Sequence, residues 1–362
     1  MIRRARQLAL GALAVVAACH HDDAVPPDLS VEQPGDFSVG TTRFAATDAA
    51  RARTLTMQAW YPTDEAAVDT PIETLEADPF RTQYAGLLAA APSCPNRTVH
   101  VAVDAQPAAG SFPTILFSHC HACTRLSNAT TAERLASHGF VVVSVDHAGD
   151  DLEEHLAGTD AMLDAAELAI RAADITFALD QLAAGTTPVA GSVDLAHVGM
   201  FGHSFGAVTA GMITQMDDRV SAGMALCAPM ENPLIPGVTI ADIDKPLAFV
   251  VAKEDNSITE FGNQLIRTNF TNAVDEAWKI EIPDAGHWSV SDLDGLVDIF
   301  APGCGDATRQ TDGSAFTYLD PPTGRAIAAA YVTAFFEATL QDDAGARAYM
   351  SSAQLGVEET SH

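Results

Sequence analysis

The chain has 362 residues, of which 48% are hydrophobic, so it is long enough for one large domain or two average ones with a sizeable core. Its 48 acidic side chains against 19 lysines and arginines give a formal net charge of −29, which disfavours nucleic acid or an anionic lipid surface as the ligand. We interpret the excess as a solvated acidic surface. No linker rich in Pro, Ser or Gly divides the middle of the chain, so we expect one domain.

Residues 1–18 are typical of an export signal, because three arginines precede an apolar run over residues 8–16 and small residues follow. The sequence VAAC at 16–19 resembles the bacterial lipobox, in which Cys19 would be lipidated and become the first residue of the mature protein. An ordinary signal peptide with a chance cysteine is the alternative. Residues 19–36 would then be a lipidated, polar tether that anchors the protein to a membrane without spanning it. No later apolar run is long enough to cross a bilayer.

Residues 37–44 and 54–61 are predicted to be two strands that enter a sheet as an antiparallel pair. Residues 64–106 are rich in Pro, Asp and Thr, with one short helical patch at 84–88, and we predict an irregular insertion. A second insertion is predicted at 289–323, long enough to overhang a site.

From residue 113 onward, apolar strands alternate with helices. Further buried-type strands are predicted at 113–118, 140–146, 198–201, 220–226, 247–252 and 278–282. Helices are predicted to end near Ser137 and to span 159–184 and 324–340, with a C-terminal tail at 346–362. This alternation predicts an α/β fold, a mostly parallel central sheet with helices on both faces.

The sequence GHSFG at 202–206 follows the strand at 198–201 and precedes an apolar, helix-like run. This strand–turn–helix context makes G-x-S-x-G a nucleophile elbow, with the serine exposed at the helix N-terminus. So sharp a turn presses the backbone on either side of the serine against neighbouring chain, which only Gly202 and Gly206 tolerate. We predict that Ser204 is a catalytic nucleophile, against the alternative of a glycine-rich turn that merely contains a serine.

Several segments in order carry a family resemblance. They are WYP at 60–62, FSH at 117–119, LASHGFVV at 135–142, the helix over 171–182, and GHSFG. In this combination the chain resembles the α/β-hydrolase superfamily, and within it the bacterial dienelactone-hydrolase-like and platelet-activating-factor acetylhydrolase-like esterases, with polyester-cleaving cutinases as cousins. The resemblance covers roughly residues 53–340 and implies one α/β-hydrolase domain over 37–345, with the two insertions poorly matched.

The resemblance implies a Ser, Asp, His triad in chain order. His287 lies in an A-G-H loop directly after the strand at 278–282, and Asp255 follows the strand at 247–252, where these esterases usually carry the acid. A serine hydroxyl is a poor nucleophile until a neutral imidazole takes its proton, and a buried carboxylate holds that imidazole in the correct tautomer.

Other positions for the acid are considered. Acetylhydrolases of the platelet-activating-factor type carry it one strand earlier, where this chain has Cys227, so the role moves to Asp255. Glu254 should point differently from the same loop, and Asp284 lies too close in sequence to His287 to approach it comfortably. Glu231 and Asp292 are the remaining carboxylates to test.

The oxyanion hole is expected to use the backbone N–H of Phe205 and, by the resemblance, that of His121 in the loop after the strand ending at Ser118. The family usually has Gly where this chain has Cys120. A zinc site is an alternative for this loop, since imidazole and thiolate at close spacing are zinc ligands and the loop carries four such side chains: His119, Cys120, His121 and Cys123. Such sites usually draw on separated pairs, however, and in an exported protein Cys120 and Cys123 could form a disulfide instead.

With Cys19 lipidated, five cysteines remain, so one is expected to be free. We choose Cys227, which ends a buried strand. Pairing of Cys94 with Cys304 is one possibility.

These expectations describe an exported serine carboxylesterase of the cell envelope that needs no metal or organic cofactor. Its partner would be an ester: a short-chain acyl ester, an acetylated phospholipid or a polyester. We expect a monomer that contacts the membrane only through its N-terminal lipid, in the periplasm or on the outer surface, and does not bind nucleic acid. The alternatives are acyl transfer on the same triad and a catalytically silent, membrane-tethered binding protein.

Overall fold

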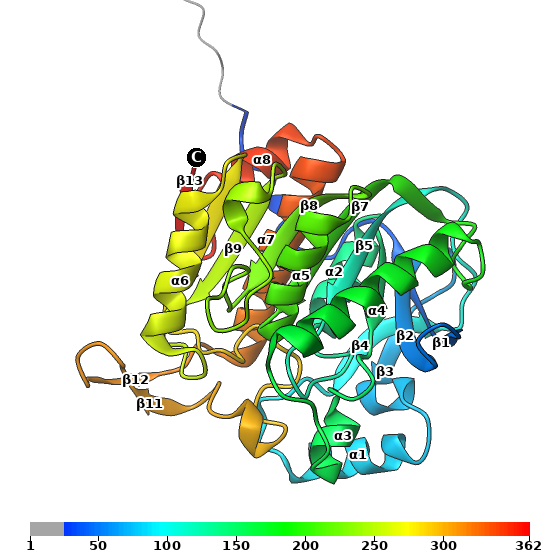
Figure 1. Cartoon of the computed structure of the whole chain (residues 1–362), viewed down its shortest axis with the longest axis horizontal. Coiled ribbons are helices and arrows are strands. Elements are labelled where there is room, and N and C mark those ends of the chain that lie inside the picture. Colours follow the sequence, from blue (N-terminus) through cyan, green and yellow to red (C-terminus); the bar gives the residue numbers. More distant parts are fainter. Residues whose placement is uncertain (1–24) are drawn as a thin grey trace, which may run out of the picture.

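The computed structural model describes residues 25–362 (Figure 1). The predicted signal peptide and the lipidation site Cys19 therefore lie outside the described residues. Within the described range, no helix combines the length and the apolar character that a membrane span requires.

A large mixed sheet runs through the molecule. Its strands are β1 (Ser38–Asp48), β2 (Arg53–Thr63), β3 (Val68–Pro71), β4 (Thr98–Val103), β5 (Phe112–Ser118), β6 (Val141–Val145), β7 (Val193–His203), β8 (Val220–Leu226), β9 (Leu247–Ala252), β10 (Ala277–Ile282) and β13 (Glu358–Ser361). Their order is β13-β10-β9-β8-β7-β5-β6-β2-β1-β4-β3, and the central run from β10 to β6 is parallel throughout. The predicted parallel sheet and the antiparallel entry by β1 and β2 are thus confirmed.

Helices cover both faces of this sheet (Figure 1). They are α1 (Phe80–Ala90), α2 (Ala129–Ser137), α3 (Leu152–Ala157), α4 (Ala165–Ala183), α5 (Phe205–Met216), α6 (Thr259–Asn272), α7 (Pro321–Leu340) and α8 (Ala344–Met350), with the short turns η1 (Leu29–Glu32), η2 (Ile72–Leu75), η3 (Ile240–Asp242) and η4 (Asp298–Phe300). Successive strand residues point to opposite faces. Accordingly Leu116 and Met200 pack with α4 and α5, whereas their neighbours Phe117 and Phe201 pack with α2 and α7.

Besides shifts of a few residues at several strand and helix ends, three parts of the chain differ from the prediction. The helix predicted over 159–184 begins only at Ala165, because the Asp164 carboxylate accepts the N–H groups of Ala166 and Glu167 and so caps its first turn. The tail predicted at 346–362 is instead part of the domain, since α8 packs against α7 and β13 pairs with the edge strand β10. The segment predicted as a tether, 19–36, is partly folded onto the domain, because η1 within it buries Val31 in the core.

The first predicted insertion, 64–106, is more regular than expected. It contains the strand pair β3 and β4, which extends the sheet beyond β1, and the helix α1 around the patch predicted at 84–88. The second, 289–323, holds η4 and a two-stranded hairpin formed by β11 (Asp306–Thr308) and β12 (Ala315–Thr317). Figure 1 shows this hairpin projecting beside the loops that follow β9 and β10.

Candidate active site

The turn between β7 and α5 holds Ser204 in a backbone conformation that side chains rarely adopt, with φ 55° and ψ −121°. Gly202 and Gly206 are required because neighbouring backbone leaves no room for a Cβ atom at either position. A Cβ at Gly202 would lie 2.0 Å from the carbonyl oxygen of Gly206, and a Cβ at Gly206 would lie 1.9 Å from that of Ser118. The predicted sharp turn is therefore present. Its geometry presents the Ser204 side chain at the first turn of α5, where the free N–H groups favour negative charge.

Ser204, Asp255 and His287 converge at the carboxyl ends of β7, β9 and β10. The Nε2 atom of His287 lies 2.8 Å from Oγ of Ser204, and its Nδ1 lies 2.7 Å from Oδ2 of Asp255. Asp255 and His287 are both fully buried, while Ser204 is half-buried and so reachable from solvent. This arrangement allows the imidazole to accept the hydroxyl proton while the carboxylate accepts the Nδ1 proton.

The orientation of Asp255 is fixed by its own loop. Its Oδ1 accepts the backbone N–H groups of Ser257 and Ile258, each at 2.9 Å, so only Oδ2 faces His287. The two loops are also joined directly, because the N–H of Glu254 donates to the carbonyl of Ala285 at 2.9 Å. Asp255 is therefore held rigidly toward the histidine.

The other carboxylates that the sequence offered are engaged elsewhere. Glu254 and Asp284 both pair with Arg309 of the hairpin, at 2.7 and 2.5 Å. Asp292 accepts hydrogen bonds from Thr130 and Asn96. The fourth, Glu231, accepts the N–H of Ile240. None of these four carboxylates hydrogen-bonds to His287, whose side chain bonds to Asp255 and Ser204.

The loop after β5, which contains His121, lies against the start of α5, because Gly206 abuts the carbonyls of Ser118 and His119. Within the described chain, neither the N–H of His121 nor that of Phe205 donates to a protein acceptor. Both predicted oxyanion donors thus belong to segments that meet beside Ser204.

Comparison with known proteins gives partial matches. Residues 29–151 match the family described as platelet-activating factor acetylhydrolase, isoform II, a segment that contains the His121 loop and ends before Ser204. The chain is 28% identical over 205 residues to a probable 1-alkyl-2-acetylglycerophosphocholine esterase from Arthroderma benhamiae, covering 51% of this chain and 50% of that protein. The chain therefore spans about half the length of this curated relative.

The whole structure is similar to a ferulic acid esterase from Streptomyces cinnamoneus, with a TM-score of 0.65 and 23% identity over 88% of this chain and 94% of that one. The chain has the α/β-hydrolase fold. The predicted fold is confirmed by this likeness, and the predicted resemblance to acetylhydrolase-like esterases by the two sequence matches. In open α/β sheets ligands bind beyond the carboxyl ends of the strands, which is where Ser204 lies.

Within residues 25–362 there are two disulfides, Cys94–Cys304 and Cys120–Cys123, and a free, buried Cys227. These are the pairs that the sequence left open, and the free thiol that it predicted. Burial raises the pKa of the Cys227 thiol well above its usual value. The zinc alternative loses its thiolates to the disulfide, and across residues 25–362 no three ligating side chains converge as a metal site would need.

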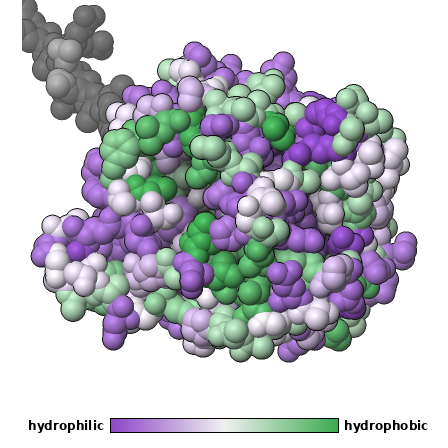
Figure 2. Space-filling view, turned by 60° about the horizontal axis from the view of Figure 1, so that its bottom comes forward, coloured by the Kyte–Doolittle hydropathy of each residue, from purple (hydrophilic) through white to green (hydrophobic). Residues whose placement is uncertain are grey.

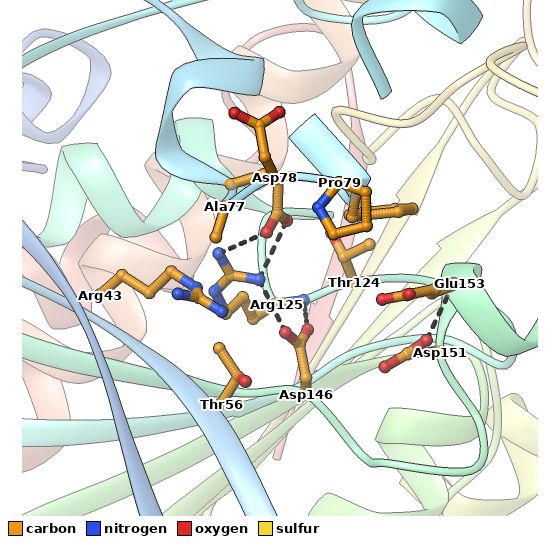
Figure 3. Close-up of a pocket in the computed structure, with 12 residues that line it drawn as sticks. Arg43, Thr56, Ala77, Asp78, Pro79, Thr124, Arg125, Asp146, Asp151 and Glu153 are labelled. Atoms are coloured by element: carbon orange, nitrogen blue, oxygen red, sulfur yellow. Dashed lines mark hydrogen bonds and ion pairs between the residues drawn. The ribbon is translucent and has the colours of Figure 1, made fainter. Parts of the chain in front are cut away.

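Beside the site, at the carboxyl end of β6, a polar cavity of about 150 Å³ opens between β1, α1 and α3 (Figure 3). Buried Arg125 lies at its floor and pairs with Glu76 and Asp146 at 2.9 and 2.7 Å. Arg43 points into it from β1. Neither Ser204 nor His287 is among the residues that line it, so we regard this cavity as separate from the α/β-hydrolase site.

Sequence reasoning missed several residues that contact the site. His203 directly precedes Ser204 and donates its Nε2–H to the carbonyl of His287 at 2.9 Å. Burial keeps the pKa of His203 well below its usual value, so its imidazole stays neutral. Its place inside GHSFG was a usable signal. Asp150 and Arg171, which hold the His121 loop, gave none, because their partners are distant in sequence.

Proposed function

We propose that this protein is a carboxylic ester hydrolase with Ser204 as nucleophile, His287 as general base and acid, and Asp255 as the orienting acid. The observation that carries the proposal is the continuous hydrogen-bonded chain from Asp255 through His287 to Ser204, with the serine on a strained turn. A carboxylate, an imidazole and a serine hydroxyl that are hydrogen-bonded in this order can carry out acyl transfer through a covalent intermediate.

In the first half-reaction, Oγ of Ser204 attacks the ester carbonyl carbon while Nε2 of His287 takes the hydroxyl proton. Negative charge collects on the carbonyl oxygen, where the N–H groups of Phe205 and His121 would stabilise it. The tetrahedral intermediate then collapses, and the departing alkoxide takes the proton from His287 and leaves as the alcohol. Ser204 now carries the acyl group.

In the second half-reaction, His287 takes a proton from water, whose oxygen attacks the acyl carbon. Collapse of the second intermediate returns that proton to Oγ of Ser204 and releases the acid. Asp255 stabilises the imidazolium in both halves without itself taking up the proton. These steps use no metal or organic cofactor.

A short-chain acyl ester is the proposed substrate class, and an acetylated phospholipid and a polyester are the specific candidates. The names of the matched family and of the fungal relative support the acetyl ester. Figure 2 looks onto the face that bears the hairpin, α1 and α3, and apolar surface gathers there around a hollow, which suits a partly apolar ester. From its first nineteen residues we further propose an exported lipoprotein of the cell envelope.

Reaction with a fluorophosphonate tests the proposal, because only an activated serine reacts. We expect the folded protein to be labelled at Ser204, and Ser204→Ala to be neither labelled nor active. Folded protein that resists labelling would support the silent binding protein instead.

A panel of p-nitrophenyl esters of rising chain length, an acetylated phospholipid and a polyester film would identify the substrate. Each is run with and without an added alcohol. Product ester that exceeds free acid in the presence of the alcohol would favour acyl transfer over hydrolysis.

A further inference from the structure

A fully buried polar cluster lies beneath the His121 loop, and the proposed reaction does not use it. Its centre is Arg171 of α4, whose side chain has no exposed surface. One guanidinium nitrogen donates to Oδ2 of Asp150 at 3.0 Å, and the other donates to the main-chain carbonyl of His119 and to Oγ of Ser118. Removing a guanidinium from water costs several kcal/mol, and packed hydrophobic residues are often at least as stable. This arginine therefore calls for a role other than stability.

The contacts of Arg171 lead to both oxyanion donors. Asp150 accepts the Nδ1–H of His121 through its second oxygen, Oδ1, which also lies 3.4 Å from the N–H of Ala122. The guanidinium carbon lies 4.7 Å from the centre of the Phe205 ring, within the range of a cation–π contact. One side chain thus touches the residue that supplies one donor, and reaches the other donor through a single carboxylate.

A second chain of hydrogen bonds anchors the start of the same loop. Oγ of Ser118 lies 2.9 Å from Nε2 of His147, and Nδ1 of His147 lies 3.1 Å from Asp174 of α4. The residue types repeat those of the active site, but all three side chains are fully buried, so no substrate reaches them. This series of hydrogen bonds positions the loop and takes no part in the reaction.

The charges around Arg171 are compatible with a fixed, permanent cation. Burial, helped by the guanidinium, holds the pKa of His119 well below its usual value and lowers that of His147 to about 4. Both imidazoles are therefore neutral at physiological pH. Asp150 and Asp174 supply the negative charge, and Arg51 and Arg53 also pair with Asp174.

We propose that Arg171 is a positioning residue for the oxyanion hole: it fixes the His121 loop through Asp150 and the His119 carbonyl, and it fixes Phe205 through its ring. The inference rests on the proposed function, since it concerns how that reaction's two donors are aligned. Misplacing a preorganised group by about 1 Å can cost a hundredfold in rate.

The test compares Arg171→Lys with Arg125→Lys. Lysine keeps the charge but loses the fork that reaches Asp150 and the His119 carbonyl together. Arg125 is a matched control, because it is likewise a buried arginine paired with carboxylates, and its side chain hydrogen-bonds neither to residues 119–122 nor to Phe205. We expect both variants to melt at lower temperature, but only Arg171→Lys to lose about tenfold to a hundredfold in kcat, with KM within twofold of wild type.

His121→Ala decides the question if Arg171→Lys does not fold. This side chain is 19% exposed, and Asp150 keeps its hydrogen bonds from Arg171 and from the N–H of Ala122, so we expect the variant to fold with a lowered melting temperature while the loop loses the bond from His121 to Asp150. We expect kcat to fall at least fivefold with little change in KM. The proposal is overturned if kcat stays within twofold in every folded variant at these two positions, or if Arg125→Lys loses as much kcat as Arg171→Lys. Wild type that a fluorophosphonate fails to label would instead overturn the proposed function.

Discussion

Replacing Asp255 with asparagine changes one atom of the proposed triad and leaves its shape intact. Asp255 uses Oδ1 for the N–H groups of Ser257 and Ile258, which asparagine can still accept through its amide oxygen. The amide nitrogen must then face Nδ1 of His287, where Oδ2 of Asp255 now lies at 2.7 Å. Because both groups cannot donate to each other, the imidazole is driven to the tautomer that carries its proton on Nε2.

That tautomer cannot take the proton of Ser204. We therefore expect Asp255→Asn to fold and to lose about three to four orders of magnitude in kcat, as loss of the orienting acid does in other triads. In free energy this is roughly 4 to 5.5 kcal/mol of transition-state stabilisation. The hydrolysis of a p-nitrophenyl ester gives kcat, and circular dichroism and thermal melting report whether the fold is kept.

Glu254→Gln and Asp284→Asn are the matched controls, since both carboxylates lie near the triad yet pair with Arg309. We expect each to cost less than tenfold. If Asp255→Asn keeps kcat within tenfold of wild type, while Glu231, Glu254, Asp284 or Asp292 proves essential, the assignment of the acid is wrong.

Three further predictions concern the rest of the chain. Burial raises the pKa of Asp294 to about 7, so the folded protein still holds this proton at pH values where the unfolded chain, with a pKa near 4, has lost it. The free energy of unfolding should therefore fall as the pH rises from 4 to 7, by at most about 4 kcal/mol. Urea titrations should find this part of the fall absent in Asp294→Asn. Replacing Cys94 and Cys304 by serine opens a loop that spans 210 residues and should lower the free energy of unfolding by about 2–5 kcal/mol, measured by denaturant titration; an unchanged midpoint would contradict this. Mass spectrometry of the exported protein should find a lipid on an N-terminal Cys19, and Cys19→Ala should leave the membrane fraction or stay unprocessed; a soluble wild type that starts elsewhere would refute the lipoprotein proposal.

The three residues of the proposed triad could be named from sequence because the family resemblance implies the order Ser, Asp, His, and because each lies at or shortly after the end of a buried strand. Apolar runs such as β9 and β10 are visible as sequence patterns, and parallel strands bring their carboxyl ends to one edge. The contacts between Ser204, His287 and Asp255 then follow from topology. Their distances and burial do not, since these depend on the loops.

Some strands and contacts were not predicted from the sequence, either because no sequence pattern marks them or because a pattern that was present was not used. The strand β13 has the polar sequence EETS and is held by backbone pairing to β10, which no side-chain pattern reveals. In β4, by contrast, buried Val99 and Val101 lie on either side of exposed His100, and this short alternation was a usable signal within the first insertion. Arg171 resembles a solvent-facing helix residue in sequence, because the carbonyl and carboxylate it meets lie 52 and 21 residues away.

The Cys94–Cys304 bridge joins the two predicted insertions, since one cysteine lies in each. Asn96 strengthens the junction through its hydrogen bonds to Asp292, from backbone to backbone at 2.9 Å and from side chain to side chain at 2.8 Å. For engineering, the two insertions therefore form one exchangeable module despite their distance along the chain. A chimera that took only one of them from another hydrolase would leave one cysteine without its disulfide partner and would lose the hydrogen bonds between Asn96 and Asp292. Exchanging the two insertions together would avoid both losses.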